Sequence, residues 1–549
     1  MDTAHIVLVG MPAAGKTTVG AELAARMQLP FVDLDAAIAL DAGAEVSVLL
    51  RHEGELAFRV REAAALDAAL QGPRAVIATG GGAAIFHGGM QRMRELGHVV
   101  WLDTDTAVLR ERILQDAVDR PLLGDTSQTL LLNLTELYQG RWATYAKAHV
   151  RVDASGAPAV VAQAIQRMLQ PPVSIDAPLA NQPSKIVVHD GELSAATEAL
   201  AELADGARIA LVVDQAVAKQ AMPLAAMLQA RNLAVAWIAV PGGEKGKTVR
   251  GLAQLWGELA DHGIGRGDLL VAVGGGATTD LAGFAAATWQ RGMRCALLPT
   301  TVLAMADASV GGKTAIDLAQ GKNLVGAFAA PALVWCALQS LTTLPVRHFR
   351  AGLAEIAKMF LLFDAAAWQA LLADAVALRK RDRSALRPHL EAAIAWKAKV
   401  VAADPYENAG TDAPLHRSLL NFGHTVGHAW EAAGNFAVLH GEAVALGMCA
   451  EAHWAEEYGH AAAGTADAVV QGLAALGLGT DWQRTVAAEV IKNAGADKKR
   501  RGGQLRLPIL AGVGHAVVAD VDLDVWTAQL VALGRERQFA QPVQVWRMA

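Results

Sequence analysis

The stretch Leu269-Leu-Val-Ala-Val-Gly274-Gly-Gly-Ala-Thr-Thr-Asp280 joins an apolar run to three glycines and then to a helix-forming segment. The run 269–273 is typical of a buried strand. Glycines directly after a strand let the backbone approach a diphosphate, and a helix over 277–287 would place its N-terminus at that anion. The stretch therefore predicts a diphosphate-binding loop in an α/β fold, although a glycine triplet alone also suits a tight turn.

Polar side chains recur between the apolar segments that follow this loop. A plain core would not need three cations and two carboxylates there, which are Arg291, Lys313, Lys322, Asp280 and Asp307. In order, the motifs GGGxxxDxxGF, RG, PTT, DxSVGGK and GKN resemble those of 3-dehydroquinate synthase, an NAD- and metal-dependent enzyme of the shikimate pathway. The resemblance covers residues 185–514.

Length, charge and cysteine content bound the rest of the chain. Its 549 residues indicate two or three domains, and a net charge of -6 with a pI near 6.2 gives no reason to expect nucleic acid or a membrane as partner. The three cysteines form no CxxC pair, which favours a reducing, cytoplasmic location. A glycine-rich loop by residue 10 leaves no room for a signal peptide.

Alternating strand-like and helix-like segments predict α/β architecture over most of the chain. We expect a P-loop kinase-type parallel-sheet domain over 1–169, a proline-rich linker over 170–184, a Rossmann-like NAD-binding domain over 185–344 and a mostly α-helical metal-binding and substrate-binding domain over 345–549.

The N-terminal module carries GxxxxGK[ST] between a strand at 6–9 and an amphipathic helix. In this P-loop pattern, backbone N–H groups and a lysine hold the β- and γ-phosphates of ATP, and a hydroxyl ligates Mg²⁺. The nucleotide-binding residues are Gly10, Ala13, Ala14, Gly15, Lys16, Thr17 and Thr18, with Thr17 as the Mg²⁺ ligand.

The phosphoryl acceptor is indicated by motifs after the P-loop. Each has an ordinary structural interpretation, such as a helix cap, a turn or a solvated arginine. Together, GxxxxGKT, FVDLD, GExxFR, GGG, RPLL and RxxxY resemble shikimate kinase. The resemblance implies shikimate contacts at Asp35, Arg59, Gly81, Gly82 and Arg141. It implies catalytic roles for Lys16, for Asp33 beside Mg²⁺ and for Arg120 as a lid cation.

The synthase resemblance assigns roles in NAD binding to several loop residues, each of which also fits ordinary loop polarity. It implies adenosine contacts at Asp214, Glu244 and Lys247, pyrophosphate contacts at Gly274 and Gly275, and nicotinamide-side contacts at Asp280, Thr300 and Thr301. Asp307 and Lys322 are expected to contact the cofactor as well.

Histidines and a glutamate in the C-terminal third form the candidate metal site. His424 and His428 lie four residues apart, a spacing that puts both on one helix face, but Thr425 occupies the position that is Glu in HExxH. An isolated HxxxH is often structural. The synthase resemblance implies that Glu355, His424 and His440 bind Zn²⁺ (or Co²⁺) and that His428 is a substrate or second-layer group.

The substrate is expected to be anionic, because Lys313, Lys358 and Lys397 occur in apolar sequence surroundings where an unpaired ammonium is costly. The resemblance implies substrate contacts at Arg291, Asp307, Lys313, Asn323, Lys358, Lys397, Arg417, Asn421, His428 and Lys498 or Lys499, with Lys313, Lys358, Lys397 and His428 catalytic. The sequence departs from the family at Asp317 and Cys336, and residues 408–416 are expected to be an insertion before Arg417.

Both resemblances together imply a bifunctional enzyme. One half would phosphorylate shikimate with MgATP, and the other would convert 3-deoxy-D-arabino-heptulosonate 7-phosphate (DAHP) to 3-dehydroquinate and phosphate with catalytic NAD and metal. The synthase family favours a homodimer. The alternative is an NAD- and metal-dependent polyol dehydrogenase behind a regulatory nucleotide-binding module.

Overall fold

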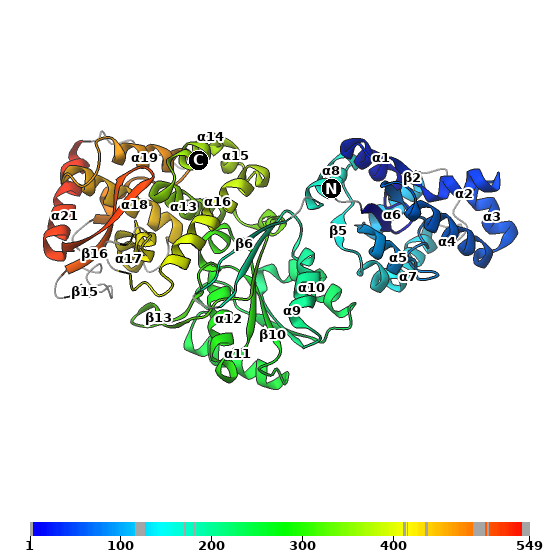
Figure 1. Ribbon diagram of the computed structural model, residues 1–549, viewed down its shortest axis with the longest axis horizontal. Coiled ribbons are helices and arrows are strands. Elements are labelled where there is room, and N and C mark those ends of the chain that lie inside the picture. The colour runs from blue at the N-terminus through cyan, green and yellow to red at the C-terminus, as the bar shows by residue number, and fades with distance from the viewer. Residues whose placement is uncertain are drawn as a thin grey trace. The chain divides into compact units, whose positions relative to one another are not determined.

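The computed structural model describes residues 4–115, 127–169, 172–179, 182–409, 413, 415–433, 438–486, 500–501 and 504–540 (Figure 1). The chain divides into two compact units. The first comprises Met1–Pro172, His189–Ile209 and Ala218–Trp237, and the second comprises Val173–Val188, Ala210–Val217 and Ile238–Ala549.

The first unit contains a five-stranded sheet in the order β2-β3-β1-β4-β5, with parallel pairing throughout. Every residue of the central strand β1 is buried, as expected where helices cover both faces of a parallel sheet. The elements are β1 (His5–Gly10), α1 (Lys16–Met27), β2 (Phe31–Asp33), α2 (Leu34–Ala42), α3 (Val46–Glu53), α4 (Glu55–Gln71), β3 (Val76–Ala78), α5 (Gly89–Leu96), β4 (Gly97–Asp103), α6 (Thr106–Gln115), α7 (Ser127–Tyr145), β5 (Val150–Asp153) and α8 (Pro158–Met168).

The segment 170–184, which was expected to be only a linker, contributes a strand to the second sheet. Strand β6 (Val173–Asp176) pairs antiparallel with β7 (Lys185–His189), and Leu179 forms an isolated bridge with Gln182. The prolines lie outside β6, so they remove no hydrogen bond from this edge strand.

The second sheet has seven strands in the order β6-β7-β14-β11-β10-β8-β9, and β10 is buried along its whole length. The remaining strands of this sheet and the helices between them in the sequence are η1 (Leu193–Ala196), α9 (Thr197–Ala204), β8 (Ile209–Asp214), η2 (Gln215–Val217), α10 (Ala218–Gln229), β9 (Val235–Val240), α11 (Val249–Asp261), β10 (Leu269–Gly274), α12 (Gly276–Thr288), η3 (Trp289–Arg291), β11 (Arg294–Pro299), the π-helical turn η4 (Ala304–Ala308) and β14 (Leu333–Ala337). Strands β12 (Lys313–Leu318) and β13 (Gly321–Phe328) form an antiparallel hairpin that packs on α12.

Beyond residue 344 the chain is mostly helical, as the sequence indicates, and the buried faces of α13, α17 and α18 pack together. The elements are η5 (Leu338–Thr343), α13 (Val346–Phe363), α14 (Ala365–Ala373), α15 (Ala375–Arg379), α16 (Arg383–Ala403), η6 (Arg417–Asn421), α17 (His424–Ala433), α18 (His440–Glu457), α19 (Thr465–Ala475), η7 (Trp482–Val486) and α21 (Leu523–Ala540). Three antiparallel strands, which the sequence analysis did not expect, complete this region: β15 (Arg500–Arg501), β16 (Gln504–Gly512) and β17 (His515–Asp522).

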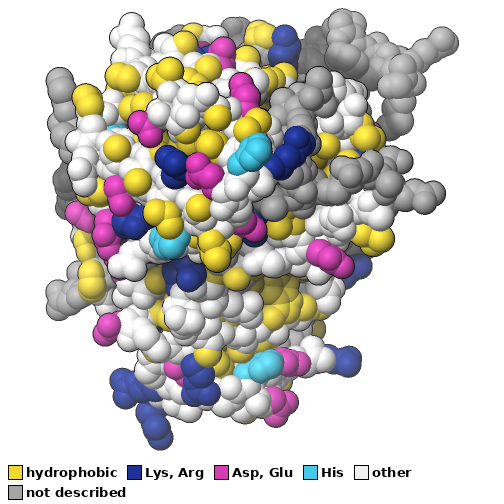
Figure 2. Space-filling view, turned by 90° about the vertical axis from the view of Figure 1, so that its right-hand side faces the viewer, with side chains coloured by type: hydrophobic (Ala, Val, Ile, Leu, Met, Phe, Trp, Pro, Cys, Tyr) yellow, Lys and Arg dark blue, Asp and Glu magenta, His cyan; other side chains and the backbone are white. Residues whose placement is uncertain are grey.

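The charged side chains on the surface and the apolar character of the helices bear on possible partners. Basic and acidic side chains are interspersed with small apolar groups on the face shown in Figure 2. Among the described residues, no helix combines the length and the apolar character that crossing a bilayer requires.

Candidate active sites

The P-loop forms an anion cradle at the start of α1. Gly15 takes a left-handed conformation (φ 92°), and α1 begins at Lys16 without a side-chain cap, so its first N–H groups face the loop. The Lys16 side chain lies against this loop, and its Nζ donates to the carbonyl oxygens of Gly10 (3.0 Å) and Met11 (2.8 Å). Burial lowers the pKa of Lys16 to about 8. The cradle fits the phosphates of a nucleotide.

Asp33 links the P-loop to the strand that follows it. Its Oδ2 accepts a hydrogen bond from Thr17 Oγ1 at 2.7 Å, and its Oδ1 accepts from the N–H groups of Asp35 and Ala36. Asp33 therefore ends β2 and caps α2, and Asp35 lies in the first turn of α2. A hydroxyl and a carboxylate beside a phosphate cradle are suitable ligands for Mg²⁺ or its water shell.

A cluster of buried arginines and glycines lies next to this cradle. Arg59 pairs with Glu62 at 2.8 Å and with Glu55 at 2.9 Å, and Arg141 Nη1 donates to the carbonyl of Gly81 at 2.7 Å. A Cβ at Gly82 would lie 2.2 Å from the Arg59 guanidinium. Glycine at this position therefore lets the loop approach the cation closely, as a small carboxylate-bearing ligand would require.

Tyr145 and Glu62 contribute to this cluster, although the sequence analysis gave neither a role. The buried Tyr145 hydroxyl lies 2.8 Å from the Gly81 carbonyl and 3.2 Å from the Gly10 carbonyl, so it connects the loop of Gly81 to the P-loop. Arg112 was also missed, and its guanidinium donates to Ala13 O at 3.4 Å. The RxxxY spacing signals Tyr145, but nothing local in the sequence signals Arg112.

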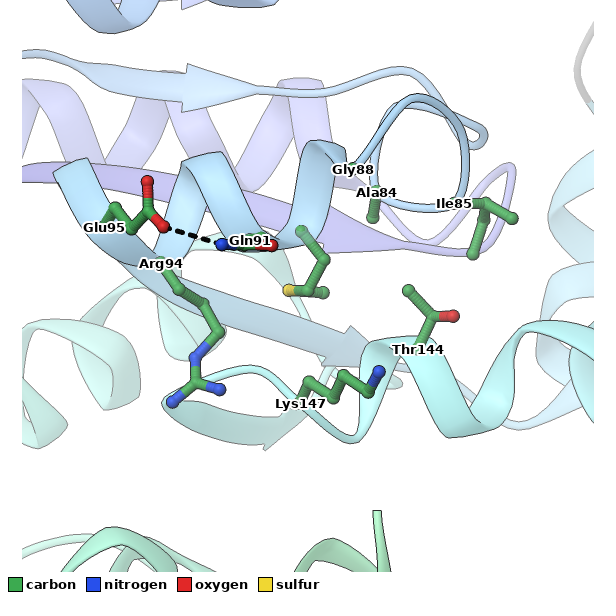
Figure 3. A pocket seen from close by; sticks show the side chains of 9 residues that line it. Ala84, Ile85, Gly88, Gln91, Arg94, Glu95, Thr144 and Lys147 are labelled. Atoms are coloured by element: carbon green, nitrogen blue, oxygen red, sulfur yellow. Dashed lines mark hydrogen bonds between the residues drawn. The ribbon is translucent and has the colours of Figure 1, made fainter. Parts of the chain in front are cut away.

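The predicted lid cation Arg120 lies outside the described residues. A separate hollow between α5 and α7 holds none of the predicted site residues (Figure 3). Arg94 and Lys147 both line it, and Arg94 is already paired with Glu198. We therefore assign the hollow no ligand.

The glycine loop after β10 has the close packing that a dinucleotide cradle needs. A Cβ at Gly274 would lie 2.6 Å from Thr278, and α12 begins after Gly275 without a side-chain cap. Thr300 N donates to the Gly274 carbonyl at 2.9 Å, and a Cβ at Gly275 would meet Thr301 at 3.4 Å. The predicted pyrophosphate and nicotinamide-side residues therefore border one loop.

Asp214 lies beside the same loop. Its carboxylate accepts from the N–H of Ala216 and, at 3.4 Å, from Thr278 Oγ1. A Cβ at Gly242 would lie 2.4 Å from Asp214 Oδ1, so the chain that leads to Glu244 passes close to this carboxylate.

The other predicted cofactor residues form a polar network at the end of the β12–β13 hairpin. Lys247 Nζ lies 2.5 Å from Asp280 Oδ2 and also donates to Asn323 Oδ1. Lys322 Nζ lies 3.6 Å from Glu244 Oε1. Burial raises the pKa of Asp280 to about 6, with Lys247 opposing the shift.

Glu355, His424 and His440 come together in the helical region. Glu355 Oε1 lies 3.8 Å from His424 Nε2 and 3.6 Å from His440 Nε2. Glu355 is fully buried, and neither carboxylate oxygen makes a hydrogen bond of acceptable geometry, although Lys358 Nζ lies 2.5 Å from Oε2. Burial opposes ionisation of Glu355, but Lys358 and His440 outweigh it and hold its pKa below the ordinary value.

His428 adds a third imidazole to this cluster. Nitrogen atoms of His424, His428 and His440 all lie within 4.8 Å of one another. One carboxylate and two or three imidazoles form a suitable donor set for a divalent transition metal, and three protein ligands would leave positions open for a substrate. The donors therefore fit a catalytic metal.

The expectation that Lys313, Lys358 and Lys397 lack partners until an anion binds is wrong. Lys313 Nζ lies 2.5 Å from Glu407, Lys358 lies 2.5 Å from Glu355, and Lys397 lies 2.5 Å from Asp307. Glu407 and Asp307 come from remote segments, so the apolar sequence neighbours of Lys313 and Lys397 concealed them, whereas Glu355 lies three residues before Lys358 on α13. Asp307 lies on the π-helical turn η4, a distortion that is frequent at functional sites.

The Arg417 loop, before which the sequence predicts an insertion, is anchored by hydrogen bonds. Asp404 accepts from the N–H groups of Asn408, Ala409 and Arg417, and the Arg417 guanidinium donates to the carbonyls of Pro405 and Gly311. Glu407, the partner of Lys313, also accepts from Asn421 Nδ2 at 2.9 Å, which places Asn421 beside Lys313.

Two predicted substrate contacts are not brought into this cluster by any described interaction. Arg291 is exposed in η3, with φ at 70°. Lys498 and Lys499 lie outside the described residues.

Comparison with known proteins identifies both halves. The family model "3-dehydroquinate synthase N-terminal" matches residues 237–351, and "3-dehydroquinate synthase C-terminal" matches 352–500. The 3-dehydroquinate synthase of Thermobifida fusca is 39% identical over 347 residues, which cover 63% of this chain and 92% of the relative. The chain belongs to the 3-dehydroquinate synthase family. The Xanthomonas campestris synthase (strain 8004) is 43% identical over 340 residues, covering 58% of this chain and 90% of the relative.

The N-terminal half has its own match. The family model "Shikimate kinase" matches residues 12–170. The chain thus joins a shikimate kinase to a 3-dehydroquinate synthase and is a bifunctional shikimate-pathway enzyme, as the motifs predicted. The same matches favour this function over the dehydrogenase alternative.

A solved structure supports the fold of the synthase half. The 2-epi-5-epi-valiolone synthase ValA from Streptomyces hygroscopicus, solved with NAD⁺ and Zn²⁺ bound, is 26% identical with a TM-score of 0.58, covering 64% of this chain and 96% of that chain. A 2-deoxy-scyllo-inosose synthase is 24% identical with a TM-score of 0.58 and covers 66% of this chain and 99% of that chain, which shows a shared fold.

Proposed function

We propose that the two activities are performed by the two side-chain clusters described above. In the kinase half, Lys16 and the first N–H groups of α1 bind the ATP phosphates, and Thr17 with Asp33 holds Mg²⁺. Arg59, Arg141, Asp35 and the loop of Gly81 and Gly82 bind shikimate. The arginines neutralise its carboxylate and Asp35 accepts from its hydroxyls.

In the synthase half, NAD lies on the loop of Gly274 and Gly275, and a Zn²⁺ or Co²⁺ ion is held by Glu355, His424 and His440. Glycines without room for a Cβ support the first assignment, and the buried carboxylate without hydrogen bonds supports the second. When bound, the metal polarises an alcohol or carbonyl oxygen and the dinucleotide accepts and later returns a hydride.

The side chains around these groups bind and orient DAHP. Lys313 and Asn421 already share Glu407, so an anionic substrate group can replace that carboxylate as their partner. Lys358 and Lys397 stabilise negative charge next to Glu355 and Asp307. The substrate's own phosphate accepts the proton that is removed before phosphate leaves.

The convergence of Glu355, His424 and His440 beside paired lysines carries this proposal. The test incubates the purified protein with DAHP and catalytic NAD, and separately with shikimate and MgATP. We expect phosphate release without net NADH, and ADP formation only when shikimate is present. Accumulation of NADH would instead match a dehydrogenase, and ADP formation without shikimate would contradict the assigned acceptor site.

We further propose that the protein works as a homodimer in the cytoplasm. The dimer is proposed from the synthase family. The reducing compartment is proposed from Cys295, Cys336 and Cys449, which are all buried free thiols. Sedimentation equilibrium tests the first proposal, since a mass near that of one chain would contradict it. Localisation of a tagged full-length protein tests the second.

A further inference from the structure

Glu431 lies directly behind the proposed metal site and has no role in the assignments above. It is on α17, seven residues after His424, and its side chain is 2% exposed. Its Oε2 lies 3.3 Å from His440 Nδ1, the ring nitrogen on the opposite side from the Nε2 that faces Glu355. The Glu431 carboxylate thus contacts the one ring nitrogen that is not directed at the metal site.

The second oxygen of Glu431 is also engaged. Lys322 Nζ donates to Oε1 at 3.2 Å, and the same ammonium lies 3.6 Å from Glu244. Lys322 comes from the β12–β13 hairpin, and Asn323 beside it accepts a hydrogen bond from Lys247. Because both oxygens have fixed partners, the carboxylate is held in one orientation.

An imidazole can present Nε2 to a cation only when its proton is on Nδ1. A carboxylate that accepts this proton selects the tautomer, fixes the ring plane and raises the basicity of the ligating nitrogen. In His424, the other proposed histidine ligand, Nδ1 has a different partner. It lies 3.2 Å from the backbone carbonyl oxygen of Phe422. The two imidazoles are therefore oriented by acceptors of different charge.

We propose that Glu431 is a positioning residue that orients His440 for metal binding and that Lys322 fixes the Glu431 carboxylate from the hairpin of the dinucleotide site. The proposal rests on the metal site assigned under the proposed function. It implies that the affinity of the full-length protein for the metal depends on a residue that does not bind the metal.

The test is a titration of the metal-free full-length protein with Co²⁺, in which the visible absorption of the bound ion is measured after each addition. Glu431→Ala is expected to weaken Co²⁺ binding by about 10–100-fold and to change the shape of the absorption spectrum. Glu431→Gln, whose amide oxygen can still accept from Nδ1, is expected to show a smaller loss. The matched control is Glu391→Gln, which removes a carboxylate paired with Arg387 on α16 and should bind Co²⁺ like the parent protein.

The variant Glu355→Gln distinguishes a failure of the proposed metal site from a failure of the role proposed for Glu431. If Glu355→Gln loses Co²⁺ binding while both Glu431 variants bind like the parent, the inference about Glu431 is overturned and the metal site stands. If Glu355→Gln itself binds like the parent, the metal site is wrong and the inference fails with it. If Glu431→Ala does not fold, Glu431→Gln decides the question alone, and parent-like affinity and spectrum would overturn the inference.

Discussion

The acceptor site of the kinase half and the cation cluster of the synthase half both gather basic side chains, but they hold them differently. In the kinase half, Arg141 and Lys16 donate to backbone carbonyl oxygens, which a substrate need not displace, whereas Arg59 is paired with Glu55 and Glu62. Each of the synthase lysines is paired with a carboxylate of its own site. Two of these three kinase cations are therefore held without a carboxylate, whereas each lysine of the synthase cluster must exchange a carboxylate partner before it can bind an anion.

Replacement of the buried Glu355 is expected to reduce activity most. Glu355→Ala removes a proposed metal ligand and leaves Lys358 as a buried ammonium without its partner. We expect DAHP turnover to fall at least about 1000-fold, equivalent to several kcal/mol of transition-state stabilisation. Phosphate release measures the loss. Shikimate phosphorylation by the same preparation is the control, and a parallel loss of kinase activity would show misfolding.

In the kinase half, the largest effect is expected at the P-loop. Lys16→Ala removes the cation that stabilises charge on the transferred phosphoryl group, so kcat should fall by about 100–1000-fold. ADP formation with shikimate is the measurement. Lys147→Ala, an exposed lysine of the same module, should keep parent activity, as should the synthase reaction in both variants.

The buried position of Lys16 also predicts a pH dependence. Burial lowers its pKa to about 8, so raising the pH through this value converts the phosphate-binding ammonium to a neutral amine in the free enzyme. We expect kcat/KM for ATP to fall about tenfold by pH 9 relative to its plateau at lower pH. Lys16→Arg keeps its charge across this range and should lack the decline. A parent profile that stays flat to pH 9 would contradict the assignment.

The smallest expected effect concerns the hydroxyl that joins the two subsites of the kinase. Tyr145→Phe removes the hydroxyl next to the carbonyls of Gly81 and Gly10 while keeping the buried ring. The expected cost to shikimate binding is about 1 kcal/mol, or about fivefold in Kd by calorimetry. Tyr138→Phe on the same helix is the control, because its hydroxyl donates to Asp103 instead. Equal losses in both variants would contradict a specific role for Tyr145.

The sequence carried the features that are encoded locally. Strand–glycine–helix order placed both phosphate loops, and the spacing of His424 and His428 placed two imidazoles on one helix face. The pairing of Lys397 with Asp307, or of Lys313 with Glu407, joins segments about ninety residues apart, and no local pattern specifies it. Glu431 went unnoticed for the same reason, since its partners lie on α18 and on β13.

Secondary structure followed the same rule. Strand β10 is buried, apolar and followed by glycines, so its observed span, Leu269–Gly274, agrees with the predicted span 269–273 within one residue. The edge strand β6 escaped prediction because prolines and charges surround a run of only four residues. The hairpin of β16 and β17 lies in a region whose helices dominated the sequence pattern.

The metal site is tested most directly by anomalous X-ray diffraction from crystals of the full-length protein loaded with Zn²⁺, measured on both sides of the zinc edge. We predict one strong peak in the synthase half, about 2.0–2.2 Å from an oxygen of Glu355 and from ring nitrogens of His424 and His440. A peak bound by other residues, or Glu355 remaining paired with Lys358 alone while zinc binds elsewhere, would contradict the account.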